Sequence, residues 1–471
     1  MSKQNILAWI DSNAAVFTKM AKQIWENPEV GYTESFASAL QAEALEKEGF
    51  RITRNVGEVS TAFVAEYGKG KPIIGILGEF DALPGLSQEI SFTESPIVEG
   101  GPGHGCGHNL LGTAGVEAAF ALKQAMAAEG FSGTIRYYGC PAEELLSGKT
   151  YMARAGAYDD LDSVLTWHPG SMNMTATMKM QALTSVEFYF SGRTAHAGAA
   201  PHQGRSALDA VELMNVGANY LREHVPDGSR IHYTITNGGL APNIVPDKAS
   251  VYYFLRGKNR GEVDHLLERL IKVAQGAAMM TETSVDWGIK AGCYDTLPNV
   301  ALNELMYEQF ALIEPLSYTE EEYRFAENLQ KSIDPAVLAS GLKMFPVSDI
   351  LPTDTFNPKQ LAGVTFGGSS DVGDASWITP MGQIMTTCMP AGTPGHTWQL
   401  TAAVGSSIGM KGMHYAAKAM ALAAYDLLLN TDGILDKARQ EFAESTKGHT
   451  YQSGIPMEVK PPFYKESIPA G

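Results

Sequence analysis

The order of predicted strands and helices changes once along this chain of 471 residues, near residue 182. Before that point, apolar strand-like runs such as 72–80 and 134–140 alternate with helix-like stretches. That alternation is typical of a mostly parallel sheet covered by helices. From there to about residue 290 the order becomes strand, helix, strand, strand, helix, strand, which is the split order of a small two-layer α+β (ferredoxin-like) domain. We therefore predict an α/β protein that contains an inserted second domain.

A chain of 471 residues is also longer than a single hydrophobic core usually supports, which favours two domains. Residues 1–181 and 291–471 would form the larger α/β domain, and residues 182–290 would be inserted into it. Residues 315–365, rich in Glu, Pro and Ser, fit neither pattern. We expect an irregular or helical excursion there.

Composition excludes several classes of protein. The formal net charge of −17 argues against binding a nucleic-acid backbone, which requires clustered Lys and Arg. No run of about 20 apolar residues predicts a membrane span, and the first residues lack the pattern of a signal peptide. The cysteines are scattered without a CxxC pair, which fits a reducing cytoplasm better than a disulfide framework. They are Cys106, Cys140, Cys293 and Cys388.

The segment 101–109, GPGHGCGHN, places His104, Cys106 and His108 at alternate positions among glycines. A thiolate and two imidazoles are good ligands for borderline-soft metals such as zinc. Glycine allows backbone conformations that other residues disfavour and lets a ligand or ion approach closely. The segment is therefore a candidate metal-binding loop.

Further polar side chains follow the predicted strands where each strand ends. Ligands of open α/β sheets bind beyond the carboxyl ends of the strands, so these side chains are expected to converge. In an adjacent pair of carboxylates, one can bind a metal while the other moves protons. The residues at these positions are Asp81, Glu143, Glu144, His168 and His396.

Taken singly, each of these residues has a simpler interpretation. A histidine in a glycine loop is commonly a turn residue, an adjacent glutamate pair is commonly a solvated face, and a cysteine is commonly a small buried hydrophobe. Their joint position at strand ends favours a metal site with two ions.

Seven segments occur in the order found in the aminoacylase/carboxypeptidase family of two-metal amidohydrolases, which this chain resembles over nearly its whole length. Within that family the chain is similar to the branch of indole-acetyl-amino-acid hydrolases and N-acyl-amino-acid amidohydrolases. The segments are GEFDALPG, GHGCGHN, PAEE, TWHPG, SGRTAHAG, GGLAPNIVPDKA and GTPGH.

The resemblance implies an enzyme that hydrolyses the amide bond of an N-acyl (aroyl) amino acid such as p-aminobenzoyl-glutamate, and the scattered cysteines favour a cytoplasmic location for it. It implies two divalent metal ions per subunit, Zn²⁺ or Mn²⁺, that activate a water molecule. The inserted domain would serve as a lid and would form a homodimer, with a homologous second subunit as a further possible partner.

The resemblance also assigns roles to residues. Glu143 would be the general base, and Asp81 would orient a metal ligand. His196 in the lid would hold the substrate carboxylate or the developing oxyanion, often in the partner subunit's site. Asn243 and Arg256 would bind the substrate's free carboxylate. The metal ligands would be Cys106, His108, Glu144, His168 and His396.

The chain departs from the family pattern at several positions. Many relatives have His-x-Asp where this chain has GEFD at 78–81, so that Cys106 would supply ligand capacity instead. Asn109 stands where the branch often has Asp, and segment 367–377 differs from the usual sequence and would reshape the pocket. His104 is not normally a ligand in the family, which leaves it a supporting or structural role.

Other functions stay open at this point. The chain could be a subunit that is inactive without a homologous partner, or could hydrolyse another N-acyl amino acid or a dipeptide. A metal-dependent binding protein would not require the free carboxylate of Glu143. A cysteine hydrolase that uses Cys106 would survive removal of metal, so sensitivity to a chelator distinguishes it.

Overall fold

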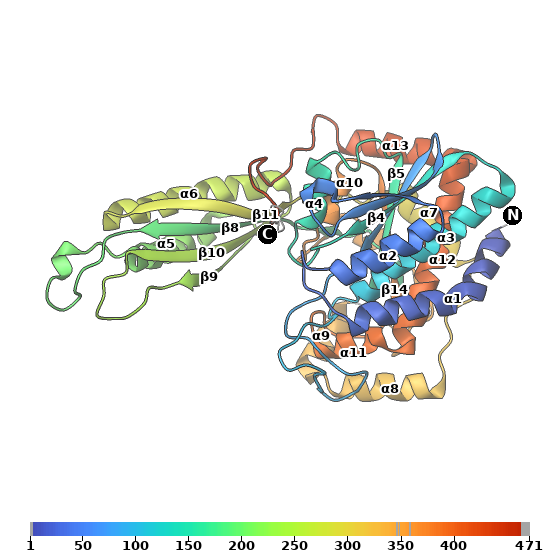
Figure 1. The fold of residues 1–471 in the computed structure, drawn as a ribbon, viewed down its shortest axis with the longest axis horizontal. Coiled ribbons are helices and arrows are strands. Elements are labelled where there is room, and N and C mark those ends of the chain that lie inside the picture. Colours follow the sequence, from blue (N-terminus) through green and yellow to red (C-terminus); the bar gives the residue numbers. More distant parts are fainter. Residues whose placement is uncertain (1–2, 345–346, 348, 358, 463–471) are drawn as a thin grey trace, which may run out of the picture.

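The computed structural model describes residues 3–344, 347, 349–357 and 359–462. The molecule consists of a helix-rich body and an arm that projects from one side of it, on the left in Figure 1. The body contains an eight-stranded sheet and the arm a four-stranded one. Each sheet has a buried apolar cluster of its own.

The sheet of the body is parallel at its centre, and antiparallel pairing joins the strands of each edge to that centre. Its central strands are β4 (Gly133–Cys140), β3 (Ile73–Glu79), β5 (Ser163–Gly170) and β14 (Met381–Thr387). The edges are β1 (Arg51–Arg54) and β2 (Phe63–Lys69) on one side, β6 (Asn173–Thr175) and β12 (Thr355–Phe356) on the other. Apolar residues run almost continuously through the central strands because helices cover both faces. The predicted mostly parallel sheet is confirmed.

Helices cover the two faces of this sheet unequally. The larger layer includes α1 (Lys3–Glu26), α2 (Ser35–Lys47), α3 (His108–Glu129), α7 (Val300–Phe310), α11 (Trp398–Gly405), α12 (Ser407–Leu429) and α13 (Ile434–Ser445). The opposite face carries α4 (Gly148–Arg154) and α10 (Val372–Ser376), with residues 451–459 packed beside them. Of the helices in the described ranges, none combines the length and apolar character that a membrane crossing requires.

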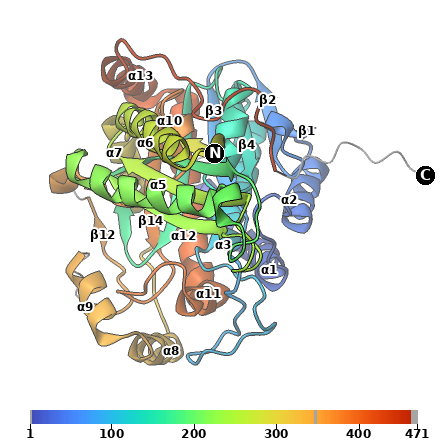
Figure 2. The same ribbon diagram turned by 90° about the vertical axis from the view of Figure 1, so that its left-hand side faces the viewer.

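The arm has the split topology that the sequence predicts. Its antiparallel sheet has the order β11 (Ser284–Cys293), β8 (Ala182–Ser191), β10 (Lys248–Gly257), β9 (Arg230–Asn237). Helices α5 (Ala207–Leu221) and α6 (Arg260–Thr281) pack on one face of this sheet, and Figure 2 looks along the arm with both helices toward the viewer. The two-layer α+β (ferredoxin-like) fold is thereby confirmed.

The unassigned stretch 315–365 contains two α-helices joined by irregular segments. Its helix α8 begins with a capping box, in which the Thr319 side chain accepts from the backbone of Glu322 and the Glu322 side chain accepts from the backbone of Thr319. Glu322 also forms an ion pair with Lys411 of α12, which attaches α8 to the body. Residues 345–346, 348 and 358 of this stretch lie outside the described residues. The elements are α8 (Glu320–Lys331), α9 (Pro335–Met344) and short strands β12 and β13 (Thr365–Phe366), the latter paired with β7 (Lys179–Met180).

Gly412 of α12 packs directly against the end of β14, where a Cβ atom would lie 2.3 Å from the backbone oxygen of Thr387. We predict that Gly412→Ala lowers the free energy of unfolding by about 1–3 kcal/mol, because overpacking outweighs the better helix propensity of alanine. Thermal unfolding followed by circular dichroism measures this change.

Gly276→Ala in α6 is the matched control, because a Cβ there would meet no atom within 4 Å. Its unfolding midpoint is expected to equal or exceed that of the parent. A Gly412→Ala midpoint as high as the parent's would contradict the close contact.

Candidate metal centre

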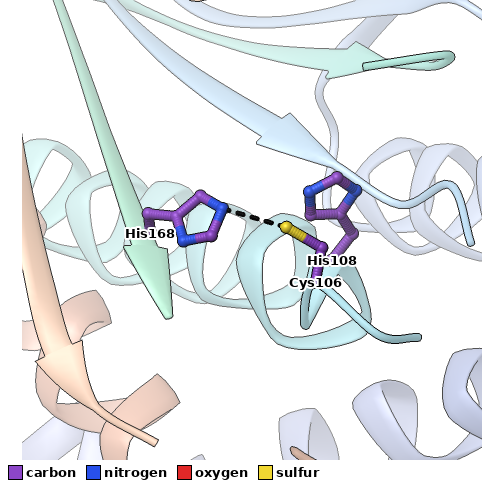
Figure 3. Close-up of side chains that lie close together, drawn as sticks. All are labelled: Cys106, His108 and His168. Carbon is purple, nitrogen blue, oxygen red and sulfur yellow. Dashed lines mark hydrogen bonds between the residues drawn. The ribbon is translucent and has the colours of Figure 1, made fainter. Parts of the chain in front are cut away.

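The carboxyl ends of the central parallel strands meet above the start of α3, and potential metal ligands gather there. Within each of three groups, the ligand atoms all lie within 4.8 Å of one another. Figure 3 shows the first group, with the side chains turned toward one another from β5 and from the loop that leads into α3. The groups are Cys106, His108 and His168; Cys106, Glu144 and His396; and Glu79, His108 and Glu143.

Glycines shape the loop that carries Cys106. A Cβ atom on Gly103 would lie 1.9 Å from the backbone oxygen of Leu86, so no other residue fits there without moving the chain. Gly107 is the N-cap of α3 and has a φ of 82°, a left-handed conformation that favours glycine. The turn at Gly107 allows His108 to begin the helix directly beside Cys106.

Asp81 connects the two segments that carry most of the potential ligands. Its Oδ1 accepts a hydrogen bond from His108 Nδ1 at 2.8 Å, and its Oδ2 accepts one from the backbone N–H of Glu144 at 2.9 Å. Burial alone would raise the pKa of Asp81, but the neighbouring His108 lowers it below its usual value. The carboxylate therefore holds the proton of His108 on Nδ1 and leaves Nε2 directed at the ligand groups.

The other two histidines approach Cys106 and Glu144. His168 donates from Nδ1 to the backbone oxygen of the next residue at 2.8 Å, and its Nε2 lies 3.3 Å from Cys106 Sγ. His396 Nε2 lies 3.4 Å from Glu144 Oε2. His396 has a φ of 58°, an uncommon conformation for a residue with a side chain. Strained backbone of this kind often occurs at functional sites.

Glu143 lies in a tight turn after β4 and is 8% exposed. Ala142 and Leu146, on either side of the glutamate pair, have φ values of 53° and 54°. Glu34 Oε1 holds this turn by accepting from the backbone N–H of Ala142 at 2.8 Å. Glu143 Oε2 thereby comes to 3.9 Å from His108 Nε2. The sequence analysis did not identify Glu34, because nothing in its helical surroundings distinguishes it from a surface glutamate.

A buried ion-pair chain behind the site was also missed. Lys149 Nζ lies 2.7 Å from Glu79 Oε1 and 2.5 Å from Asp371 Oδ1, and all three side chains are buried. Glu79 Oε2 in turn lies 3.3 Å from His108 Nε2. The sequence did contain a signal for this chain, because Glu79 ends the apolar strand β3. A charge buried in such a run is rarely unpaired, so a partner of opposite charge could have been expected.

The lid residues lie elsewhere in the chain. His196 and Asn243 are exposed neighbours at the far end of the arm, beyond Ser191 of β8. A strand of ten residues spans about 33 Å, so within one chain these side chains do not join the ligand groups. His196 Nδ1 accepts from the backbone N–H groups of Gly198 and Ala199, both at 3.1 Å, which places the proton of the neutral ring on Nε2.

Arg256 lies at the base of the arm, next to the body. Its Nη1 donates to Ser369 Oγ at 2.7 Å, and Ser369 belongs to the same segment, 367–377, as Asp371. Burial lowers the pKa of the Arg256 guanidinium. Among the described residues, no carboxylate lies within ion-pair distance of Arg256, so a half-buried cation faces the junction without a protein anion.

Comparisons with known proteins agree with this architecture. Residues 180–279 match the peptidase dimerisation domain of the M20 family. The chain is 40% identical to one of the subunits of p-aminobenzoyl-glutamate hydrolase from Escherichia coli, over 96% of this chain and 97% of that protein. The chain belongs to the M20 family of metal-dependent amidohydrolases and peptidases, enzymes that act on amide bonds.

Solved structures share the fold at low sequence identity. An aminobenzoyl-glutamate utilization protein from Klebsiella pneumoniae is 18% identical with a TM-score of 0.61, covering 89% of this chain and 98% of that one. A dinuclear metal-binding M20 peptidase from Bacillus subtilis is 16% identical with a TM-score of 0.55, covering 87% and 98%. These similarities confirm the fold that the sequence predicts.

The residues of this M20 amidohydrolase fit the two divalent ions of the family. Buried His108 Nε2 and Glu144 Oε1 have no hydrogen-bond partner among the described residues. Burial, followed by the charge of Glu79, raises the pKa of Glu143 to about 8, and burial raises that of Glu144 to about 7. Carboxylates crowded in this way, together with a thiol and imidazoles, form a set of ligands that cations would stabilise.

Two residues of the glycine-rich segment have structural partners instead. His104 is buried and donates from Nε2 to the backbone oxygen of Ile24 at 3.2 Å, and burial lowers its pKa to about 3, which keeps it neutral. Asn109 donates from Nδ2 to the backbone oxygen of Val404 at 3.3 Å. Neither joins a ligand group of the described residues.

We predict that Asp81→Asn weakens metal binding by about 10–100-fold, because the amide no longer fixes the proton of His108 on Nδ1. Metal content per chain at buffered free metal, measured by mass spectrometry, tests this prediction. Asp374→Asn is the matched control: Asp374 is equally buried but accepts from Thr150 and Tyr451, away from the ligand groups. Equal metal loss in both variants would contradict a specific role for Asp81.

Proposed function

We propose that this amidohydrolase cleaves the amide bond of an N-aroyl amino acid, with p-aminobenzoyl-glutamate as its substrate. The observation that carries the proposal is the buried glutamate pair after β4. Glu144 belongs to a ligand group with Cys106 and His396. Glu143 lies beside it, in the group with Glu79 and His108, and would serve in proton transfer. The substrate is supported by the relative from Escherichia coli, whose name specifies that hydrolysis.

In the proposed enzyme, two divalent ions, Zn²⁺ or Mn²⁺, would be held by these ligand groups, two of which include Cys106. His108 and His168 would complete one site, and Glu144 and His396 the other. When bound, such ions polarise an amide carbonyl and lower the pKa of a water molecule. Asp81 would maintain the orientation of His108 through the hydrogen bond described above.

Glu143 would act as the general base. Its carboxylate would take a proton from water as the water oxygen attacks the amide carbon. It would then deliver that proton to the amide nitrogen as the carbon–nitrogen bond breaks, which releases the aryl carboxylic acid and the free amino acid. Burial of Glu143 beside His108 keeps competing bulk water away from the proton path.

The junction between arm and body offers groups for both ends of such a substrate. Arg256 would bind the carboxylate of the amino acid through two parallel hydrogen bonds. Phe254, on the face of the arm's sheet opposite its helices, packs near Leu146 of the metal-binding turn, and its ring contacts Tyr252 at a centroid distance of 5.3 Å. An aryl group would be accommodated against these rings.

We also propose that residues 182–290 form an inserted lid and dimerisation domain, with residues 1–181 and 291–471 as the catalytic domain. A homodimer would bring the tip of the arm into the partner's site. There the Nε2–H of His196 would donate to the oxyanion, and Asn243 beside it would contact the substrate. The separation of these residues from their own chain's ligand groups supports this arrangement.

A cytoplasmic location is part of the proposal. The four cysteines are free, and three of them are buried. A reducing compartment suits an enzyme whose partly exposed cysteine, Cys106, would bind metal rather than form a disulfide.

The first test is release of glutamate from p-aminobenzoyl-glutamate by the purified protein with Mn²⁺ or Zn²⁺. Glu143→Gln is expected to retain two ions per chain and to lower kcat by about 100-fold or more, because the amide cannot accept the proton. Retained turnover in this variant would contradict the general-base assignment, and turnover that survives complete removal of metal would favour a thiol mechanism.

Mixing two inactive variants tests the homodimer. After subunit exchange between His196→Ala and Glu143→Gln, half of the dimers would be mixed and each would contain one intact site. Activity should therefore return to about a quarter of the parent value. No recovery from exchanged dimers would contradict action of His196 in the partner's site.

A second candidate function is that of one component in a hetero-oligomer. The observation that favours it is the name of the relative from Escherichia coli, which describes a single subunit of the hydrolase. Metal-loaded protein that releases glutamate only after addition of a homologous second subunit would support this alternative over the homodimer.

A further inference from the structure

The buried chain of charges formed by Asp371, Lys149 and Glu79 ends on the metal ligands. Lys149 and Asp371 are fully buried, and Glu79 is 2% exposed. Burying such charges costs free energy that their mutual attraction repays only in part, so stability alone is a weak reason for their presence. The same contacts fix the orientation of the Glu79 side chain.

Two contacts fix Lys149. Its Nζ lies 2.5 Å from Asp371 Oδ1, and its backbone N–H donates to Asp371 Oδ2 at 2.8 Å. The same Nζ lies 2.7 Å from Glu79 Oε1. Because Lys149 occupies Oε1, the second oxygen of Glu79 is left directed toward His108.

A cation fits between Glu79 and His108. His108 Nδ1 donates its proton to Asp81, so Nε2 is the ring atom that faces Glu79. Glu79 Oε2 lies 3.3 Å from Nε2, which has no hydrogen-bond partner among the described residues. A metal ion that takes the place of a proton on Nε2 would therefore also be within reach of this carboxylate oxygen.

The spacing also suits a shared ion. Ligand distances of about 2.0–2.2 Å at a tetrahedral ion place two ligand atoms about 3.4 Å apart. The 3.3 Å between Glu79 Oε2 and His108 Nε2 matches that spacing.

We infer that Glu79, held in place by Lys149, is an additional ligand of the metal ion bound by His108. Lys149 is a positioning residue in this arrangement, and Asp371 anchors Lys149. A carboxylate oxygen is a harder ligand than thiolate or imidazole, so Glu79 favours Mn²⁺ at this site relative to a site of sulfur and nitrogen alone. The inference rests on the two-metal site of the proposed function.

The test measures metal binding without activity. Calorimetric titration of the metal-free protein with Mn²⁺, and in a second series with Zn²⁺, gives the affinity of each site. Glu79→Gln is expected to weaken one of the two sites by about tenfold or more for Mn²⁺, with a smaller loss for Zn²⁺. Glu79→Asp retains a carboxylate and is expected to recover part of the loss.

Glu117→Gln provides the matched control. Glu117 is fully buried on α3 and pairs with His414 Nδ1 at 2.8 Å, outside the three ligand groups. Both Mn²⁺ sites of this variant should keep their parental affinity. Equal losses in Glu79→Gln and Glu117→Gln would overturn the inference, since general destabilisation would then explain both.

The result also separates the inference from the proposed function. A parent that binds two ions while Glu79→Gln binds them with unchanged affinity overturns the role of Glu79 alone. A parent that binds no metal overturns both.

For Lys149, the double variant Lys149→Met/Asp371→Asn removes the anchoring pair together and should show the same selective loss of Mn²⁺ affinity. Parental Mn²⁺ affinity in this folded double variant would overturn the positioning role.

Discussion

The arrangement of the site depends on one buried carboxylate, Asp81. It lies directly after β3 and accepts from both the His108 ring and the backbone of Glu144, so it joins the start of α3 to the turn after β4. Neither segment has a local reason to adopt this relative position. Because His108 Nδ1 is hydrogen-bonded to Asp81, the ring is oriented with Nε2 toward the remaining potential ligands.

Electrostatics explains why such a site is built for cations. Five carboxylates of the site and of the ion-pair chain behind it lie in the interior, and one ammonium group, Lys149, is buried among them. If all were ionised, negative charge would exceed positive charge, and divalent cations would offset that excess. Burial raises the pKa values of Glu143 and Glu144, and neighbouring carboxylates raise them further. The five carboxylates are Glu79, Asp81, Glu143, Glu144 and Asp371.

The length of the arm separates two groups of residues. Its strands of eight to ten residues carry the loop with His196 far from the body, while Arg256 stays at the base where the two parts meet. The arm has a hydrophobic core of its own, built from α5, α6 and one face of its sheet. It can therefore hold both positions rigidly. The division of the proposed substrate-contacting groups between base and tip follows directly from this length.

The sequence by itself determined the order of the elements and the chemical types of the ligands. Strand and helix periodicities are local, so the mostly parallel sheet, the split unit from β8 to β11 and the polar strand ends at Asp81, Glu143 and His168 were all predictable. The very short strands β6, β7, β12 and β13 were not, because two or three residues carry no periodicity. Helix α8 was missed although its capping box at Thr319 and Glu322 was a readable signal.

Only the tertiary structure decided how distant residues pair. Lys149 and Asp371 are 222 positions apart, and nothing in either neighbourhood indicates that they meet behind Glu79. The direction of His108, the support of the glutamate turn by Glu34 and the remoteness of His196 from its own ligand groups also depend on packing between elements. The physical reason is that periodicity acts over a few residues, whereas the balance of buried charges is settled by groups that the folded chain brings together.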